Sequence, residues 1–284
     1  MIYTVENDFL TVSVNSFGAE LWSLKSKESQ REYVWQGKPE IWSGRAPILF
    51  PIVGQLQGGN YKYGGRKYEL PKHGFARKSE FILSVQEKNS LTMTLSFNDS
   101  TLKSFPFKFR LSVKHTLIDE RLEVEHRVEN LDDKIIYFSI GAHPGFNCEL
   151  GSYLEFELYE NADSLKIDNE AMLTDRRDKI LEDSKILVLQ EDTFKEDALI
   201  FEKLNSSRLT LKDKNGKSIL KFDFGKPSYL GLWAKPAAPY VCIEPWYGIN
   251  DSRKKDSDFT KKQAIQSLNP GEDFFFSWNA EIIL

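Results

Sequence analysis

The chain has 284 residues, of which 40% are apolar and 13% aromatic, and all-β chains of this size often form one undivided domain. We therefore expect a single domain over residues 1–284. The formal charge of -4 and the pI near 5.7 come from mixed charges without a basic stripe, which argues against nucleic acid as a partner. The chain contains no run of about 18 apolar residues and no signal-peptide pattern, so we expect a soluble, cytoplasmic protein with no membrane partner.

Short segments with period-two alternation of apolar and polar residues dominate the chain, separated by turn residues about every ten positions. This pattern predicts an all-β sandwich or barrel with about fifteen to eighteen strands. Gly64-Gly65 and Asn215-Gly216 each stand between two strand-like runs and predict two-residue hairpins. Helical periodicity is scarce, and we expect only short helices around Asp192 to Leu199 and around Thr260 to Ala264.

Residues 109–128 form two alternating apolar runs with Asp119-Glu120 between them. If these two residues form a turn, His115 and His126 become diagonal neighbours on one face of a hairpin. Two interpretations of that face stay open at this point. The histidines belong either to the core or to the lining of a sugar-binding cleft.

The two cysteines, Cys148 and Cys242, provide no disulfide framework and no Cys-x-x-Cys pair for zinc. Both are expected to be reduced. Cys242 lies in the apolar run YVCIEPW, so we assign it to packing rather than to nucleophilic chemistry. The segment from Asn250 to Lys262 is rich in charged residues and Ser, which is typical of a solvated loop.

Only four histidines occur, and two of them, His73 and His143, have unusual neighbours. A following proline holds a residue in extended geometry, so His143 before Pro144 is expected at the end of the run IIYFSIGA. Glu244 stands before Pro245 in the same way and is expected at the end of the strand YVCI. A carboxylate after four apolar residues needs a partner, because burying an unpaired charge is costly.

Aromatic residues gather around these groups in the sequence, and sugar rings stack on such side chains: Trp42, Phe75, Phe146, Trp233, Trp246 and Tyr247. Four segments in order, RAPILFPIVG, PKHGFAR, GAHPGF and CIEPWYG, resemble those of the aldose 1-epimerase (galactose mutarotase-like) superfamily, above all its LacX-type branch. The resemblance extends over nearly the whole chain, as far as the closing PGEDFFFSW.

The resemblance implies a galactose mutarotase-like β-sandwich that binds a hexose on a concave sheet face, with no metal or organic cofactor. It implies that His143 is the general acid toward the ring oxygen and Glu244 the base toward the anomeric hydroxyl. By the same resemblance, His73 binds near the ring oxygen, Arg45 binds substrate and Asp197 holds sugar hydroxyls. Trp246 is a further candidate for substrate binding, as an aromatic neighbour of Glu244.

Opening a cyclic hemiacetal requires one group to take the anomeric proton and another to give a proton to the ring oxygen, so a glutamate and a histidine suffice. We expect the carboxylate to raise the pKa of His143.

Three alternatives stay open. One is a metal site made of His73, His143 and Glu244. Another is a hexose 6-phosphate substrate held by Arg45 and Arg77, although Arg77 could equally form a salt bridge that fixes its loop. The last is a non-catalytic carbohydrate-binding protein of the same fold. The sequence leaves the oligomeric state open between a monomer and a homodimer.

Overall fold

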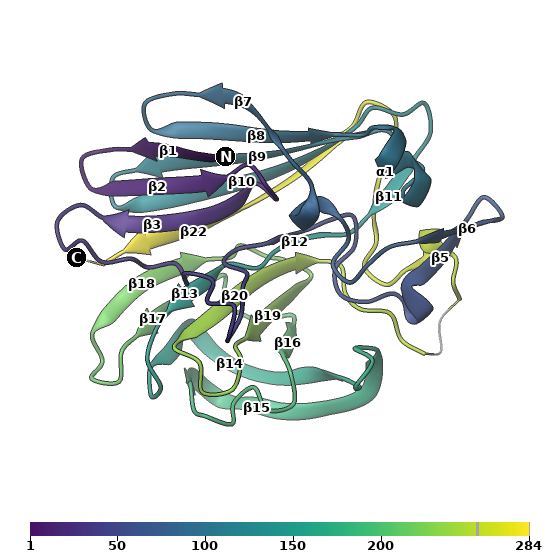
Figure 1. The fold of residues 1–284 in the computed structure, drawn as a ribbon. Coiled ribbons are helices and arrows are strands. Elements are labelled where there is room, and N and C mark those ends of the chain that lie inside the picture. The colour runs from purple at the N-terminus through teal and green to yellow at the C-terminus, as the bar shows by residue number, and fades with distance from the viewer. Residues whose placement is uncertain (254–255, 284) are drawn as a thin grey trace.

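Antiparallel strands make up most of residues 1–253 and 256–283, the part of the chain that the computed structural model describes (Figure 1). This architecture confirms the predicted all-β sandwich with few short helices. The described strands number 22, more than expected, because several have only two or three residues. Such short pieces carry too few residues for alternation to reveal them.

One large sheet of 15 strands runs through the molecule. Its strands, in order across the sheet, are β4 (Ile48–Leu49), β12 (Ile140–Ala142), β20 (Tyr240–Tyr247), β19 (Tyr229–Trp233), β16 (Leu199–Glu202), β14 (Tyr153–Ile167), β17 (Arg208–Lys212), β18 (Ser218–Asp223), β22 (Asp273–Ile282), β10 (Arg121–Asn130), β9 (Phe109–Ile118), β8 (Ser90–Ser96) and β7 (Ile82–Gln86). In addition, β13 (Gly145–Asn147) pairs with β20, and β15 (Leu173–Val188) pairs with β14.

Three smaller sheets complete the fold. They are β1 (Ile2–Glu6), β2 (Leu10–Asn15) and β3 (Glu20–Ser26); β5 (Asn60–Tyr63) and β6 (Arg66–Glu69); and β11 (Ile136–Phe138) and β21 (Gln266–Leu268). Alternate residues of β2, such as Val12, are buried in the same hydrophobic cluster as alternate residues of β9 and β10, such as Val113 and Val124. Their burial joins the three-stranded sheet to the large one.

Four short helical pieces lie among the described residues: α1 (Asp99–Ser104), η1 (Gln57–Gly59), η2 (Ala76–Lys78) and η3 (Phe259–Lys261). The expected helix from Asp192 to Leu199 is wrong, because residues 192–197 form successive turns before β16 begins at Leu199. The expected helix at 260–264 is only the 3-10 turn η3. Helix α1 was not predicted from the sequence, although Asn98 and Thr101 form a capping box at its start.

The predicted hairpins are present. Gly64-Gly65 joins β5 to β6. Asn215-Gly216 lies inside a five-residue connection, 213–217, rather than a two-residue turn. Asp119-Glu120 joins β9 to β10, and Asp119 has the positive φ of 50° that a tight turn needs.

The charged segment 250–262 is not a fully solvated loop, and its residues 254 and 255 lie outside the described part. Lys262 is buried, and its Nζ lies 2.8 Å from Oδ1 of Asp251 and also donates to the carbonyl of Ile249. Composition alone could not show this, because a buried ion pair uses the same residue types as a solvated surface.

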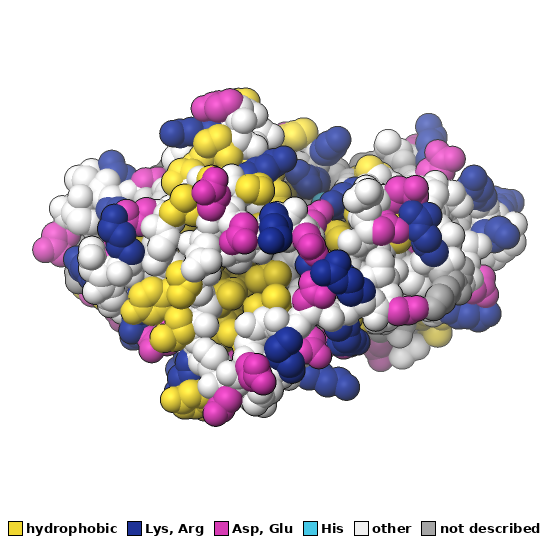
Figure 2. Space-filling view, turned by 90° about the horizontal axis from the view of Figure 1, so that it is seen from below, with side chains coloured by type: hydrophobic (Ala, Val, Ile, Leu, Met, Phe, Trp, Pro, Cys, Tyr) yellow, Lys and Arg dark blue, Asp and Glu magenta, His cyan; other side chains and the backbone are white. Residues whose placement is uncertain are grey.

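On the face seen from below, basic and acidic side chains are intermixed and border an apolar patch (Figure 2). That face therefore has no extended region of a single charge sign. Within the described residues, helices are all too short or too polar to cross a bilayer.

Candidate active site

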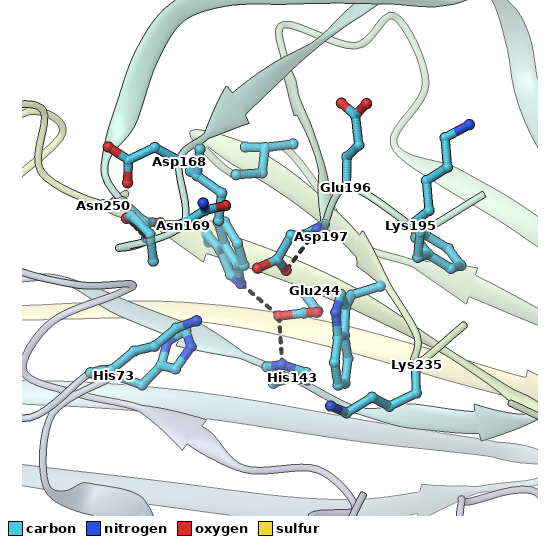
Figure 3. A pocket seen from close by; sticks show the side chains of 18 of the residues that line it. His73, His143, Asp168, Asn169, Lys195, Glu196, Asp197, Lys235, Glu244 and Asn250 are labelled. Atoms are coloured by element: carbon cyan, nitrogen blue, oxygen red, sulfur yellow. Dashed lines mark hydrogen bonds and ion pairs between the residues drawn. The ribbon is translucent and has the colours of Figure 1, made fainter. Parts of the chain in front are cut away.

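A cavity of about 870 Å³ opens over the middle of β20 and contains most of the predicted site residues (Figure 3). It lies within the usual volume range of small-molecule sites. Its walls come from the segment before η2, the β12–β13 junction, the tip of the β14–β15 hairpin, the turns before β16, and the end of β19. Segments far apart in the chain thus meet around one strand.

Glu244 lies inside β20 rather than at its end, which corrects the expected position. Pro245 stays within the strand and pairs with Leu230 of β19. The N–H of Ile243 bonds to the carbonyl of Pro144, so the nitrogen of Pro245, two residues on, faces the same side of the strand. There the neighbouring chain is interrupted between β12 and β13, and the missing N–H of Pro245 costs no ladder bond.

His143 lies in that interruption, between β12 and β13, and so reaches the cavity beside Glu244. Its imidazole stacks on Trp42, with ring centroids 5.1 Å apart, and meets Trp233 edge-on at 5.7 Å. These two contacts with indole rings fix the orientation of the His143 imidazole. The prediction that Pro144 places His143 at a strand end agrees with its position after β12.

The carboxylate of Glu244 and the imidazole of His143 form a buried pair. Nε2 of His143 lies 3.3 Å from Oε2 of Glu244, and Nε1 of Trp246 donates to the same oxygen at 3.2 Å. The second oxygen, Oε1, is buried and has no hydrogen-bond partner among the described residues. It is therefore the carboxylate atom left available to a ligand.

Burial dominates the electrostatics of this pair. Removal from water raises the pKa of Glu244 well above its usual value. Burial, followed by the nearby Arg77 guanidinium, lowers the pKa of His143 to about 3. The pKa of His143 is thus lowered rather than raised as expected, because desolvation of the imidazolium is the largest cause and the nearby cations act in the same direction.

His73 completes the group, with its ring centroid 6.1 Å from that of His143. Its backbone has a φ of 66°, which is uncommon for a residue other than glycine. The N–H of Gly54 donates to Nδ1 at 3.1 Å, so Nε2 carries the proton of the neutral ring. Burial, followed by the charge of His143, lowers the pKa of His73 well below its usual value. His73 is therefore a neutral hydrogen-bond donor.

The two predicted arginines, Arg45 and Arg77, differ in their position relative to the cavity. Arg45 is not among the described residues that line the cavity, since its Nη1 donates to the carbonyl of Trp22 and to Oε1 of Gln36. Its guanidinium also lies over the Trp22 ring, 3.7 Å from the centroid. This placement argues against the expected contact with substrate. Arg77 lines the cavity, and its guanidinium forms no direct salt bridge with the described residues, although the charges of Glu20 and Glu244 act on it.

Asp197 and Trp246 also line the cavity. Asp197 has a φ of 74°, and its Oδ1 accepts from the N–H of Ala198, which fixes the carboxylate at the rim. Of the six aromatics named from the sequence, Trp42, Trp233 and Trp246 line the cavity, whereas Phe75, Phe146 and Tyr247 pack on or in the core.

His115 and His126 are diagonal neighbours, as predicted: His115 pairs with Val124, and His126 with Val113. Both are buried in the sandwich and absent from the described lining of the cavity. Of the two open interpretations, the structure supports the core.

Sequence reasoning missed Lys72, Lys235 and Asn250 among the cavity residues. Lys72 is adjacent to His73, so its position in PKHGFAR could have revealed it. Lys235 and Asn250 follow β19 and β20 in segments without a motif, and only the fold brings them to the cavity.

The predicted metal trio is not the one that the structure assembles. Among the described residues, His143, Cys242 and Glu244 form the group of potential ligands, with donor atoms within 4.8 Å of one another, and His73 is outside it.

The fold is that of a galactose mutarotase-like sandwich, and comparison with known proteins gives the same class. The family model for aldose 1-epimerase matches residues 1–266, and the chain belongs to that family. Protein LacX (plasmid) of Lactococcus lactis subsp. lactis is 34% identical over 288 residues, which cover 95% of each chain.

Solved structures give the same result. A galactose mutarotase related enzyme from Lactobacillus acidophilus is 34% identical and superposes with a TM-score of 0.95 over 100% of this chain and 98% of that one. A galactose mutarotase-like protein from Lactobacillus casei ATCC 334 is 29% identical, with a TM-score of 0.93 and all of both chains covered.

Proposed function

We propose that the protein is an aldose 1-epimerase that interconverts the α and β anomers of a hexose, acting without a cofactor. The observation that carries this proposal is the Glu244–His143 pair, 3.3 Å apart and open to a cavity of about 870 Å³. A group that accepts a proton and a group that donates one thus stand side by side. Opening and closing a hemiacetal requires this combination.

In the proposed reaction, Glu244 takes the proton of the anomeric hydroxyl through Oε1, the oxygen without a partner. The electron pair of that O–H bond forms the carbonyl at C1, and the bond from C1 to the ring oxygen breaks. His143, which has first received the single proton of the pair from Glu244 across their 3.3 Å contact, donates that proton to the ring oxygen as it leaves. Rotation about the C1–C2 bond and closure on the other face give the second anomer, with the two groups exchanging tasks.

His73 and Asp197 have supporting roles in this proposal. The Nε2–H of His73 is available to donate to the ring oxygen, because Nδ1 is engaged by Gly54. Asp197 accepts from sugar hydroxyls at the rim of the cavity. Trp246 holds the carboxylate of Glu244 through its indole N–H and lies against the sugar.

The test is anomer exchange, followed by polarimetry or NMR on freshly dissolved glucose and galactose. We expect Glu244→Gln and His143→Ala each to lower the rate by about 10²-fold or more, because each removes a proton-transfer group. The exposed Glu125→Gln on β10 is the matched control and keeps the wild-type rate. Near-wild-type exchange in either site variant would refute the assignment.

A second candidate substrate, a hexose 6-phosphate, is favoured by a specific observation. Lys72 and Arg77 flank His73, line the cavity, and form no ion pair or hydrogen bond with the described residues. The carbon that bears the phosphate is attached to C5, the neighbour of the ring oxygen. A phosphate there would lie on the His73 side, within reach of both cations, and Arg77 could bind it bidentately.

Comparing glucose with glucose 6-phosphate separates the two candidates. If the phosphorylated sugar is the substrate, Arg77→Met lowers its kcat/KM by about 10-fold or more and leaves free glucose nearly unchanged. Lys78→Met, an exposed change on the same turn, is the control. Equal losses for both sugars would assign Arg77 to a role other than binding phosphate.

A further inference from the structure

A group of potential metal ligands lies at and beneath the wall of the cavity: His143 and Glu244 line it, and Cys242 is buried behind them. Sγ of Cys242, one imidazole nitrogen of His143 and one carboxylate oxygen of Glu244 lie within 4.8 Å of one another. Cys242 is fully buried two residues before Glu244 on β20, so both side chains are on the same face of that strand. Cys242 pairs with Gly145, two residues after His143.

Two observations indicate that this group is suited to a ligand. Oε1 of Glu244 is buried without a hydrogen-bond partner among the described residues, although such atoms are normally satisfied. His143 and Glu244 also border the cavity, which leaves room for a further ligand such as water. The first observation gives a free donor atom, and the second gives the open coordination position of a non-structural metal site.

The geometry approaches that of tetrahedral zinc. At ordinary bond lengths, zinc holds S, N and O ligands about 3.4 to 3.6 Å apart. The 3.3 Å between Nε2 of His143 and Oε2 of Glu244 is already close to that, whereas the widest separation in the group, up to 4.8 Å, must shorten to about 3.6 Å when the ion binds. A thiolate and a carboxylate together balance the charge of a divalent ion, which a buried site requires.

We propose that His143, Cys242 and Glu244 form an inhibitory site for a thiophilic divalent cation such as Zn²⁺. Thiolate and imidazole ligands favour such ions over Mg²⁺ or Ca²⁺. The bound ion takes the lone pairs that the acid–base pair uses, so sugar and metal exclude each other. Binding of the ion stands on its own, whereas inhibition of catalysis rests on the function proposed above.

The test uses Co²⁺ as a spectroscopic probe of the full-length, metal-free protein. We expect one equivalent of Co²⁺ to give tetrahedral visible bands and a thiolate-to-cobalt charge-transfer band, both removed by Zn²⁺. Cys242→Ser loses the charge-transfer band, and Cys148→Ser, the matched control, retains it. Glu244→Gln keeps the cysteine and weakens Co²⁺ binding by at least about 10-fold.

A wild-type spectrum identical to that of free Co²⁺, or a charge-transfer band that persists in Cys242→Ser, would overturn the proposal. The Glu244→Gln titration keeps it testable if Cys242→Ser fails to fold, since unaltered affinity in Glu244→Gln also contradicts the ligand set. None of these spectra depends on turnover. A protein that binds Co²⁺ but does not exchange anomers would therefore refute the proposed function and leave the metal site standing.

Discussion

The buried His126 makes stability depend on pH in a way that one substitution can isolate. Its ring stacks on Phe276, with centroids 4.6 Å apart and planes 7° apart, and its Nδ1 has no hydrogen-bond partner among the described residues. Burial, followed by the charge of neighbouring His115, lowers the pKa of His126 to about 3. We consider His126→Phe, which keeps the stacked ring and removes the titration.

The magnitude follows from linkage. In the unfolded chain the pKa is near the usual 6.5, so below pH 6.5 the unfolded state binds a proton that the folded state refuses. Stability associated with neutral His126 is therefore complete above pH 6.5 and is lost as the pH falls toward 3. The loss is about 1.4 kcal/mol per pH unit, or about 2 kcal/mol between pH 7 and pH 5.

The assay is urea unfolding at several pH values, with wild type and variant compared at each. Other titrating groups act equally in both proteins, so the difference in unfolding free energy isolates His126. We expect the variant to gain about 2 kcal/mol relative to wild type on going from pH 7 to pH 5. Val113→Ala, at the cross-strand partner, is a control that lowers stability equally at both pH values. A difference between His126→Phe and wild type that does not change with pH would refute the reasoning.

Three further outcomes are expected. Because burial holds the pKa of His143 at about 3, kcat/KM for anomer exchange should show no inflection near pH 6.5, and a clear one would contradict the pair as described. Asn98→Ala removes the cap of α1 and should lower the unfolding free energy by about 1 kcal/mol, measured by urea denaturation; no change would mean that the cap contributes nothing. Lys262→Met removes the buried ammonium beside Asp251 and should cost about 3 to 5 kcal/mol, whereas the exposed Lys261→Met should leave the unfolding free energy nearly unchanged; similar costs would contradict the buried pair.

The fold could be predicted from the sequence where the alternation of apolar and polar residues was regular. Alternation over β9 and β10 fixed both the hairpin and the diagonal placement of His115 and His126, because a period of two determines which side chains share a face. The signal failed at the 192–197 turns, where local polar composition resembles a helix end. It also failed at Lys262, since only tertiary packing decides whether a lysine is solvated or buried.

The site was partly readable for a related reason. His143 and Glu244 stood out because each precedes a proline, and the structure explains this by one interruption in the sheet: Pro144 lies in it and Pro245 faces it. That single feature accounts for two separate sequence signals. The motif did not predict that the Arg45 side chain lies against Trp22 and Gln36, because a motif gives the neighbours of a residue in sequence but not the direction of its side chain.

The pKa shifts of Glu244 and His143 fit the proposed reaction when the two residues are treated as one pair that shares a proton, rather than as a separate acid and base. A hexose is uncharged in both anomeric forms, so the pair must hold the same number of protons before and after each turnover, and the proposed steps need that number to be one. A raised pKa for Glu244 opposes loss of that proton, and a lowered pKa for His143 opposes gain of a second one. Burial therefore keeps the pair at one proton across neutral pH, whichever of the two carries it. The same burial opposes a charged sugar group beside the pair, so a phosphate would have to be held by cations of the cavity wall such as Lys72 and Arg77.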